Sequence, residues 1–109
     1  MQALYKHTRV PPLHAPGDSD VTWLIDFDRV RHLLAPRTAT YLSGQGTFLA
    51  AMGIGPRAQS LAKATPQDAD TIADALERLT APDRMGTLFK VLAAVSPGLP
   101  PPPGFEAPR

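Results

Sequence analysis

The sequence predicts a small α+β unit whose sheet is incomplete. Its 109 residues suffice for one domain at most, and they follow the order extended, helix, extended, helices, extended. The apolar run LFKVLAAV at 88–95, interrupted only by Lys90, is typical of a strand covered on both faces. Two or three strands cannot cover such a strand, so we expect its partners to lie outside these residues.

The N-terminal part contains two extended segments. QALYKHTRV at 2–10 predicts a strand or arm that ends before Pro11, because proline fixes φ and lacks an N–H. VTWLI at 21–25 is rich in β-branched and aromatic residues and is also predicted to be extended.

A helix is predicted over 27–35, with Asp26 as its cap. The prediction rests on apolar residues at helical spacing, which are Phe27, Val30 and Leu34. A single helix starting at Asp20 is the alternative, because Trp23 would share the same face.

The middle of the chain predicts a strand and two helical segments. TATYLSGQG at 38–46 indicates a strand that closes in a glycine turn. TFLAAMGI is predicted to be a short helix that stops near Gly53, and Pro56 is predicted at the first position of the next helix.

TPQD predicts the start of a further helix, with Thr65 as N-cap, Pro66 at the first position and Asp68 in a variant capping box. Its apolar stripe is expected to be packed and consists of Ala69, Ile72, Ala73, Leu76 and Leu79. Its other face is expected to be solvated and carries Asp70, Asp74, Glu77 and Arg78.

Thirteen prolines stand out in the composition. Four of them, at 100–103, favour polyproline II within a Pro-rich tail over 97–109. We therefore divide the chain into a folded portion at 1–96 and this tail. An unstructured or surface-draped terminus is the simpler interpretation of the tail, and a PxxP ligand is the sharper one.

Composition excludes several classes of function. The net charge of +1 provides no footprint for nucleic acid, and the absence of cysteine excludes disulfides and thiolate metal sites. The apolar runs are far shorter than the ~20 residues of a membrane span, and the N-terminus lacks the apolar region of a signal peptide. A soluble protein of a reducing compartment is expected.

No catalytic, cofactor-binding or metal-binding residue is predicted. The three histidines lie in different segments without metal-ligand spacing, and the aspartates at 18–28 lack the glycine and glutamate of a calcium loop. GQG and GIGP match no phosphate-binding pattern. Gln45 and Lys90 adjoin apolar runs, where either could face a groove, although solvent exposure or a local hydrogen bond is the simpler expectation.

Three ordered motifs carry a family resemblance. They are PGDSDVTWLIDF at 16–27, GQGTFLAAMGI at 44–54 and MGTLFKVLAAVSPGLPPPPGF at 85–105. They resemble the patterns PGEADLTAHVDF, TQGxFLxxLGI and MGxLFKVL in the C-terminal part of the MidA-like class I S-adenosylmethionine-dependent methyltransferases. That family includes the mitochondrial complex I assembly factor that methylates an arginine on a subunit of that complex.

The resemblance implies an α/β, Rossmann-like methyltransferase fold, of which this chain supplies the last helix and the sixth and seventh strands, with a helical insert between them. The seventh strand, 88–95, would be antiparallel in an otherwise parallel sheet and would pair with strands encoded upstream of Met1. S-adenosylmethionine would be held by that upstream segment. The chain alone is therefore expected to bind no cofactor, to be inactive and to self-associate.

The resemblance also implies a protein substrate and a cytoplasmic or mitochondrial location. From the same resemblance, Asp26 and Gln45 are the candidates for lining the substrate groove. The family histidine of TAH is replaced by Leu24, and Gly44 stands where the family often has threonine. A free-standing interaction module that uses the helices and the Pro-rich tail is the alternative function.

Overall fold

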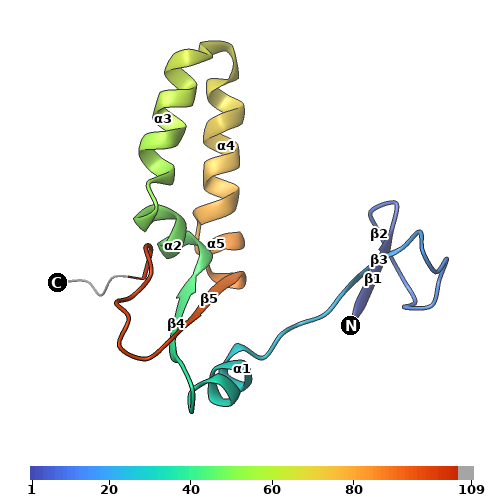
Figure 1. Cartoon of the computed structure of the whole chain (residues 1–109). Helices are drawn as coiled ribbons and strands as arrows, with labels where there is room; N and C mark the ends of the chain where they lie inside the picture. Colours follow the sequence, from blue (N-terminus) through green and yellow to red (C-terminus); the bar gives the residue numbers. More distant parts are fainter. Residues whose placement is uncertain (106–109) are drawn as a thin grey trace. The chain divides into compact units, whose positions relative to one another are not determined.

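The computed structural model describes residues 1–105 and divides into two units, Met1–Val30 and the residues from Arg31 onward. Figure 1 gives the course of the chain. Each unit is built around its own antiparallel sheet, with three strands in the first unit and two in the second.

The first sheet has the order β2-β1-β3, formed by Gln2–Tyr5 (β1), Thr8–Val10 (β2) and Asp20–Thr22 (β3). The segment predicted as one strand or arm is therefore a hairpin. Its two turn residues, Lys6 and His7, have φ of 48° and 63°, which is the left-handed conformation that a tight two-residue hairpin turn requires. Neither residue is glycine, so composition did not mark the turn.

Helix α1, Phe27–Leu34, lies within the predicted range, and the alternative helix from Asp20 is wrong. The Arg29 backbone N–H donates to Oδ1 of Asp26 at 3.1 Å, which confirms the predicted cap. The segment predicted as extended at 21–25 is a strand only in part, because β3 ends at Thr22. The apolar side chains between β3 and α1 are exposed, with Trp23 70% and Leu24 83% accessible.

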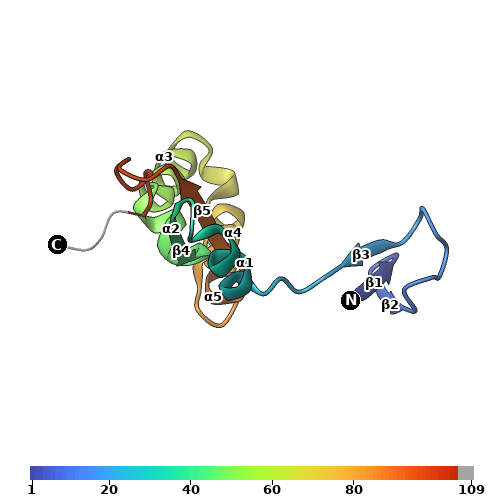
Figure 2. The ribbon, with the colours of Figure 1, turned by 60° about the horizontal axis from the view of Figure 1, so that its bottom comes forward.

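In the second unit, Ala39–Gly44 (β4) and Lys90–Val95 (β5) form an antiparallel pair in which Leu42 lies opposite Leu92. The helices lie between these strands in sequence. They are Gln45–Ala51 (α2), Ile54–Ala64 (α3), Pro66–Asp68 (η1, a 3-10 turn), Ala69–Thr80 (α4) and Met85–Leu88 (α5). Figures 1 and 2 both show α3 and α4 side by side as a helical hairpin.

One edge of β5 pairs with β4 inside the chain, and its other edge has no partner strand among residues 1–105. The pairing of residues 88–95 with upstream strands stays a prediction. Leu88 is not part of the strand, because Met85–Leu88 forms a helical turn and the Phe89 N–H donates to the Met85 carbonyl at 3.2 Å. The predicted glycine turn after β4 is likewise absent, since α2 begins directly at Gln45.

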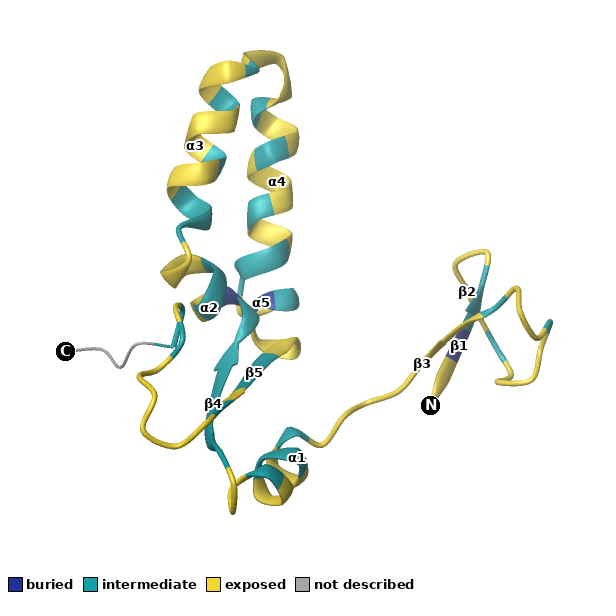
Figure 3. Ribbon diagram, viewed as in Figure 1, coloured by how far each residue is buried: buried dark blue, intermediate teal, exposed yellow. Residues whose placement is uncertain are grey.

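The core is thin. Within residues 1–105, only Ala3, Gly46 and Gly86 are buried, and the remaining apolar residues are half-buried or exposed (Figure 3). In the predicted stripe of α4, Ala73 is exposed, and the other four residues are half-buried, namely Ala69, Ile72, Leu76 and Leu79. The charged face of α4 is exposed, as predicted.

The Pro-rich segment is held against the second unit as far as it is described. The Phe105 ring packs on Tyr41 of β4 and Phe48 of α2, with centroids 6.1 and 5.3 Å apart. Gly104 has φ of 88°, and a Cβ there would lie 2.5 Å from the Phe48 ring, so the backbone itself contacts that ring. Residues 106–109, at the end of the tail predicted at 97–109, lie outside the described residues.

The predicted capping box at Thr65 is wrong. The Thr65 side chain makes no capping hydrogen bond, and the Asp68 N–H donates instead to the Thr65 backbone carbonyl at 2.9 Å. This bond closes the 3-10 turn, so α4 begins only at Ala69. Pro56 also differs from its predicted place, as it is the third residue of α3.

Thr65→Ala is therefore expected to change the free energy of unfolding by less than about 0.5 kcal/mol, as for a substitution that removes no hydrogen bond. Asp26→Ala, which does remove a capping bond, is expected to destabilise α1 by about 1 kcal/mol. Urea denaturation of both variants tests the contrast. A loss at Thr65 as large as that at Asp26 would contradict the structure.

Candidate functional site

Gln45 lies where β4 passes into α2 and joins three elements of the second unit. Its backbone N–H donates to the Phe89 carbonyl at 2.8 Å. Its side-chain Nε2 donates to the Leu79 carbonyl, in the last turn of α4, at 3.0 Å. The side chain thus satisfies a helix C-terminal carbonyl that has no partner within its own helix. Gln45 ties the base of the helical hairpin to the sheet.

Two buried glycines bring the backbones together around Gln45. A Cβ at Gly46 would overlap the Thr80 carbonyl oxygen, and a Cβ at Gly86 would overlap the same oxygen and lie 2.8 Å from that of Ala81. The Gly86 N–H donates to the Ala81 carbonyl at 3.0 Å. Only glycine allows this approach of α2 and α5 to the end of α4.

Asp26 belongs to the first unit and is exposed. Its Oδ1 caps α1, which is a structural role of its own. Gln45 belongs to the second unit. Their assignment to a substrate groove stays a prediction. Leu24, which replaces the family histidine, presents an exposed aliphatic side chain.

The described residues provide no metal centre, because no three His, Asp or Glu side chains among residues 1–105 gather closely enough to hold an ion. The same part of the chain contains no helix long and apolar enough to cross a membrane.

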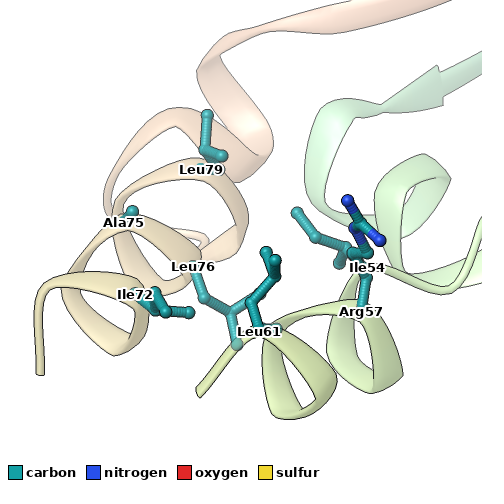
Figure 4. A pocket seen from close by; sticks show the side chains of 8 residues that line it. Ile54, Arg57, Leu61, Ile72, Ala75, Leu76 and Leu79 are labelled. Atoms are coloured by element: carbon teal, nitrogen blue, oxygen red, sulfur yellow. The ribbon is translucent and has the colours of Figure 1, made fainter. Parts of the chain in front are cut away.

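An apolar groove of about 190 Å³ lies between α3 and α4 (Figure 4). The antiparallel hairpin places Ile54 and Leu79 toward its base and Leu61 and Ile72 toward its turn. Sequence reasoning recognised the stripe of α4 but not the groove. The matching stripe of α3, with Ile54, Ala58 and Leu61 at spacings of four and three, was the signal available.

No family model matches the chain. Among curated proteins, it is 40% identical to the mitochondrial protein arginine methyltransferase NDUFAF7 homolog of Drosophila melanogaster, in an alignment of 96 residues that covers 84% of this chain. The predicted family resemblance is confirmed. The chain spans 22% of the length of that methyltransferase.

Two crystal structures from Burkholderia thailandensis share the fold. An uncharacterized superfamily protein aligns with a TM-score of 0.78 and 24% identity over 97% of this chain and 29% of its own. A superfamily member bound to S-adenosyl-homocysteine aligns with a TM-score of 0.73 and 23% identity over 97% of this chain and 26% of its own. This likeness is consistent with the predicted class I methyltransferase-like fold.

Proposed function

We propose that these residues belong to the C-terminal part of an S-adenosylmethionine-dependent protein arginine methyltransferase. The observation that carries the proposal is the 40% identity over 96 residues to the Drosophila arginine methyltransferase homolog. The S-adenosyl-homocysteine in the second Burkholderia structure supports S-adenosylmethionine as the cofactor of the complete enzyme. The relative is named as mitochondrial, which supports the mitochondrial alternative over the cytoplasmic one.

In this proposal, the partner of the chain is an upstream methyltransferase segment that binds the cofactor. The half-buried residues of β4 and β5 support such a partner, because a finished domain covers its strands. Among residues 1–105, β5 pairs only with β4, so its other edge is available to a further strand. In the proposed methyltransferase, Asp26 and Gln45 remain the candidates for lining the substrate groove.

A chimera tests the proposal. In the full-length Drosophila relative, the matching 96 residues are replaced by those of this chain, and methyl transfer from labelled S-adenosylmethionine to protein arginine is measured. We expect the chimera to retain transfer, and a chimera carrying Gly86→Ala to lose it with the fold. A soluble, folded chimera that binds S-adenosylmethionine but transfers no methyl group would contradict the proposed reaction.

The 109-residue chain by itself is expected to show no measurable binding of S-adenosylmethionine. The glycine-containing junction between β4 and α2 offers no free backbone donor at Gln45, because the Gln45 N–H already donates to the Phe89 carbonyl. Gly46 is packed against the Thr80 carbonyl, which leaves no space for a ligand there. The carboxylate of S-adenosylmethionine would need such backbone donors to be free. Isothermal titration calorimetry is the measurement, with the full-length Drosophila relative as positive control. A micromolar dissociation constant for the chain would overturn this expectation.

A further inference from the structure

The groove between α3 and α4 has the form of a site for a third helix. Two helices alone cannot enclose their facing apolar stripes, and a third layer is the usual solution. Here Leu61 remains 39% exposed, while Ile72, Leu76 and Leu79 are half-buried. Ala58 and Ala75 line the middle of the groove with small side chains, which leaves its volume of about 190 Å³ open for an incoming side chain.

One charged side chain lies among these apolar ones. Arg57 lines the groove one turn of α3 after Ile54, and Figure 4 shows the two residues together at one end. Arg57 is exposed, and within residues 1–105 its side chain makes no ion pair or hydrogen bond. An occupant that covers the groove displaces water from the guanidinium, and a carboxylate best replaces the lost hydrogen bonds because it accepts two from the same guanidinium. The occupant should therefore carry an aspartate or a glutamate.

Charge also argues against a second copy of this chain in the groove. The lining residues of the hairpin include no acidic side chain. The acidic residues of α4, namely Asp70, Asp74 and Glu77, are exposed and do not line the groove. Two hairpins packed groove to groove would bring two arginines into the interface without a carboxylate for either. A partner of different sequence fits the charge pattern better.

We propose that the α3–α4 groove binds an amphipathic helix of a partner protein, which inserts aliphatic anchors and pairs an acidic residue with Arg57. The anchors would follow the i, i+4, i+7 spacing of helix-in-groove recognition. The groove would take them along the line from Ile54 and Leu79 to Leu61 and Ile72. This docking function goes beyond the methyltransferase proposal and does not depend on it.

A synthetic helical peptide is the probe. It is alanine-rich, about 18 residues long so that it is helical in water, with leucine at i, i+4 and i+7 and one glutamate a turn before the first leucine. A matched peptide carries lysine in place of that glutamate. Fluorescence anisotropy of each labelled peptide is followed against the concentration of the 109-residue chain, whose helix content is checked by circular dichroism.

We expect saturable binding of the glutamate peptide, with the lysine peptide bound at least about fivefold more weakly. Arg57→Glu should reverse this preference, and Ala75→Trp should abolish binding of both peptides by filling the groove. Arg78→Glu is the matched control, because Arg78 is an exposed arginine of α4 that does not line the groove. It should leave the affinities of both peptides unchanged.

Three results would overturn the proposal. The first is no saturable binding by the folded chain. The second is binding that does not distinguish glutamate from lysine or respond to Arg57→Glu. The third is a dimer in sedimentation that Ala75→Trp converts to a monomer, since the groove would then belong to a second copy of the chain.

Discussion

Gly86→Ala is expected to destabilise the second unit by at least about 3 kcal/mol, near the upper end of what overpacking costs. The new methyl group would overlap the Thr80 carbonyl oxygen and lie 2.8 Å from that of Ala81. Both are backbone atoms at the end of α4 and cannot rotate away like a side chain. Relief requires α5 to separate from α4, which would also break the bond from the Gly86 N–H to Ala81. Urea denaturation followed by circular dichroism at a helix wavelength measures the loss, because α2, α3 and α4 all lie in this unit.

Gly55→Ala is the matched control. Gly55 lies in the first turn of α3, and a Cβ there would meet nothing within 4 Å. Alanine should therefore stabilise the helix, by roughly 0.5 kcal/mol or more, through its better helix propensity. Gly46→Ala should resemble Gly86→Ala, since it meets the same Thr80 oxygen. If Gly86→Ala were as harmless as Gly55→Ala, the close approach of α5 to α4 would be wrong.

The contrast between these glycines marks the limit of what the sequence could predict. The helix at 27–34, its Asp26 cap and the apolar stripe of α4 follow from spacing and from a local side-chain hydrogen bond, and all three are found. Gly46 and Gly86 look like ordinary loop glycines in sequence. Their requirement arises from contact with Thr80, a residue of another element, which no local pattern reveals.

The local hydrogen bond or exposure expected for Gln45 and the capping box predicted at Thr65 are wrong for related reasons. Gln45 was expected to be exposed or locally bonded, but its side chain bonds to Leu79, 34 residues away. Thr65 and Asp68 have the spacing of a capping box, but the chain closes a 3-10 turn through backbone atoms instead. The same residue types suit both conformations, so the choice depends on how α3 returns into α4. That return is set by the packing of the hairpin.

The amides of β5 are expected to exchange with solvent in alternation. The Gln45 N–H donates to the Phe89 carbonyl, which is one of the two bonds of a hydrogen-bonded pair, while the Phe89 N–H donates to Met85. Such pairs alternate along an antiparallel ladder, so the register places the N–H groups of Val91 and Ala93 toward β4. The N–H groups of Leu92 and Ala94 point to the opposite edge, where the described residues offer no strand. In the isolated chain, Val91 and Ala93 should exchange at least about tenfold more slowly than Leu92 and Ala94, which corresponds to a local opening cost of about 1.4 kcal/mol.

Hydrogen exchange by NMR measures this difference, and β1 serves as an internal control. β1 lies between β2 and β3, so Ala3 and Leu4 should both be protected without alternation. Raising the protein concentration distinguishes a free β5 edge from one that pairs with a second copy of the chain. If the edge self-associates, exchange at Leu92 and Ala94 should slow as concentration rises, because a second strand then accepts their N–H groups. Equal protection of all four β5 amides in dilute solution would show that the edge is already covered within the chain. An upstream methyltransferase segment would then have no free strand edge to pair with.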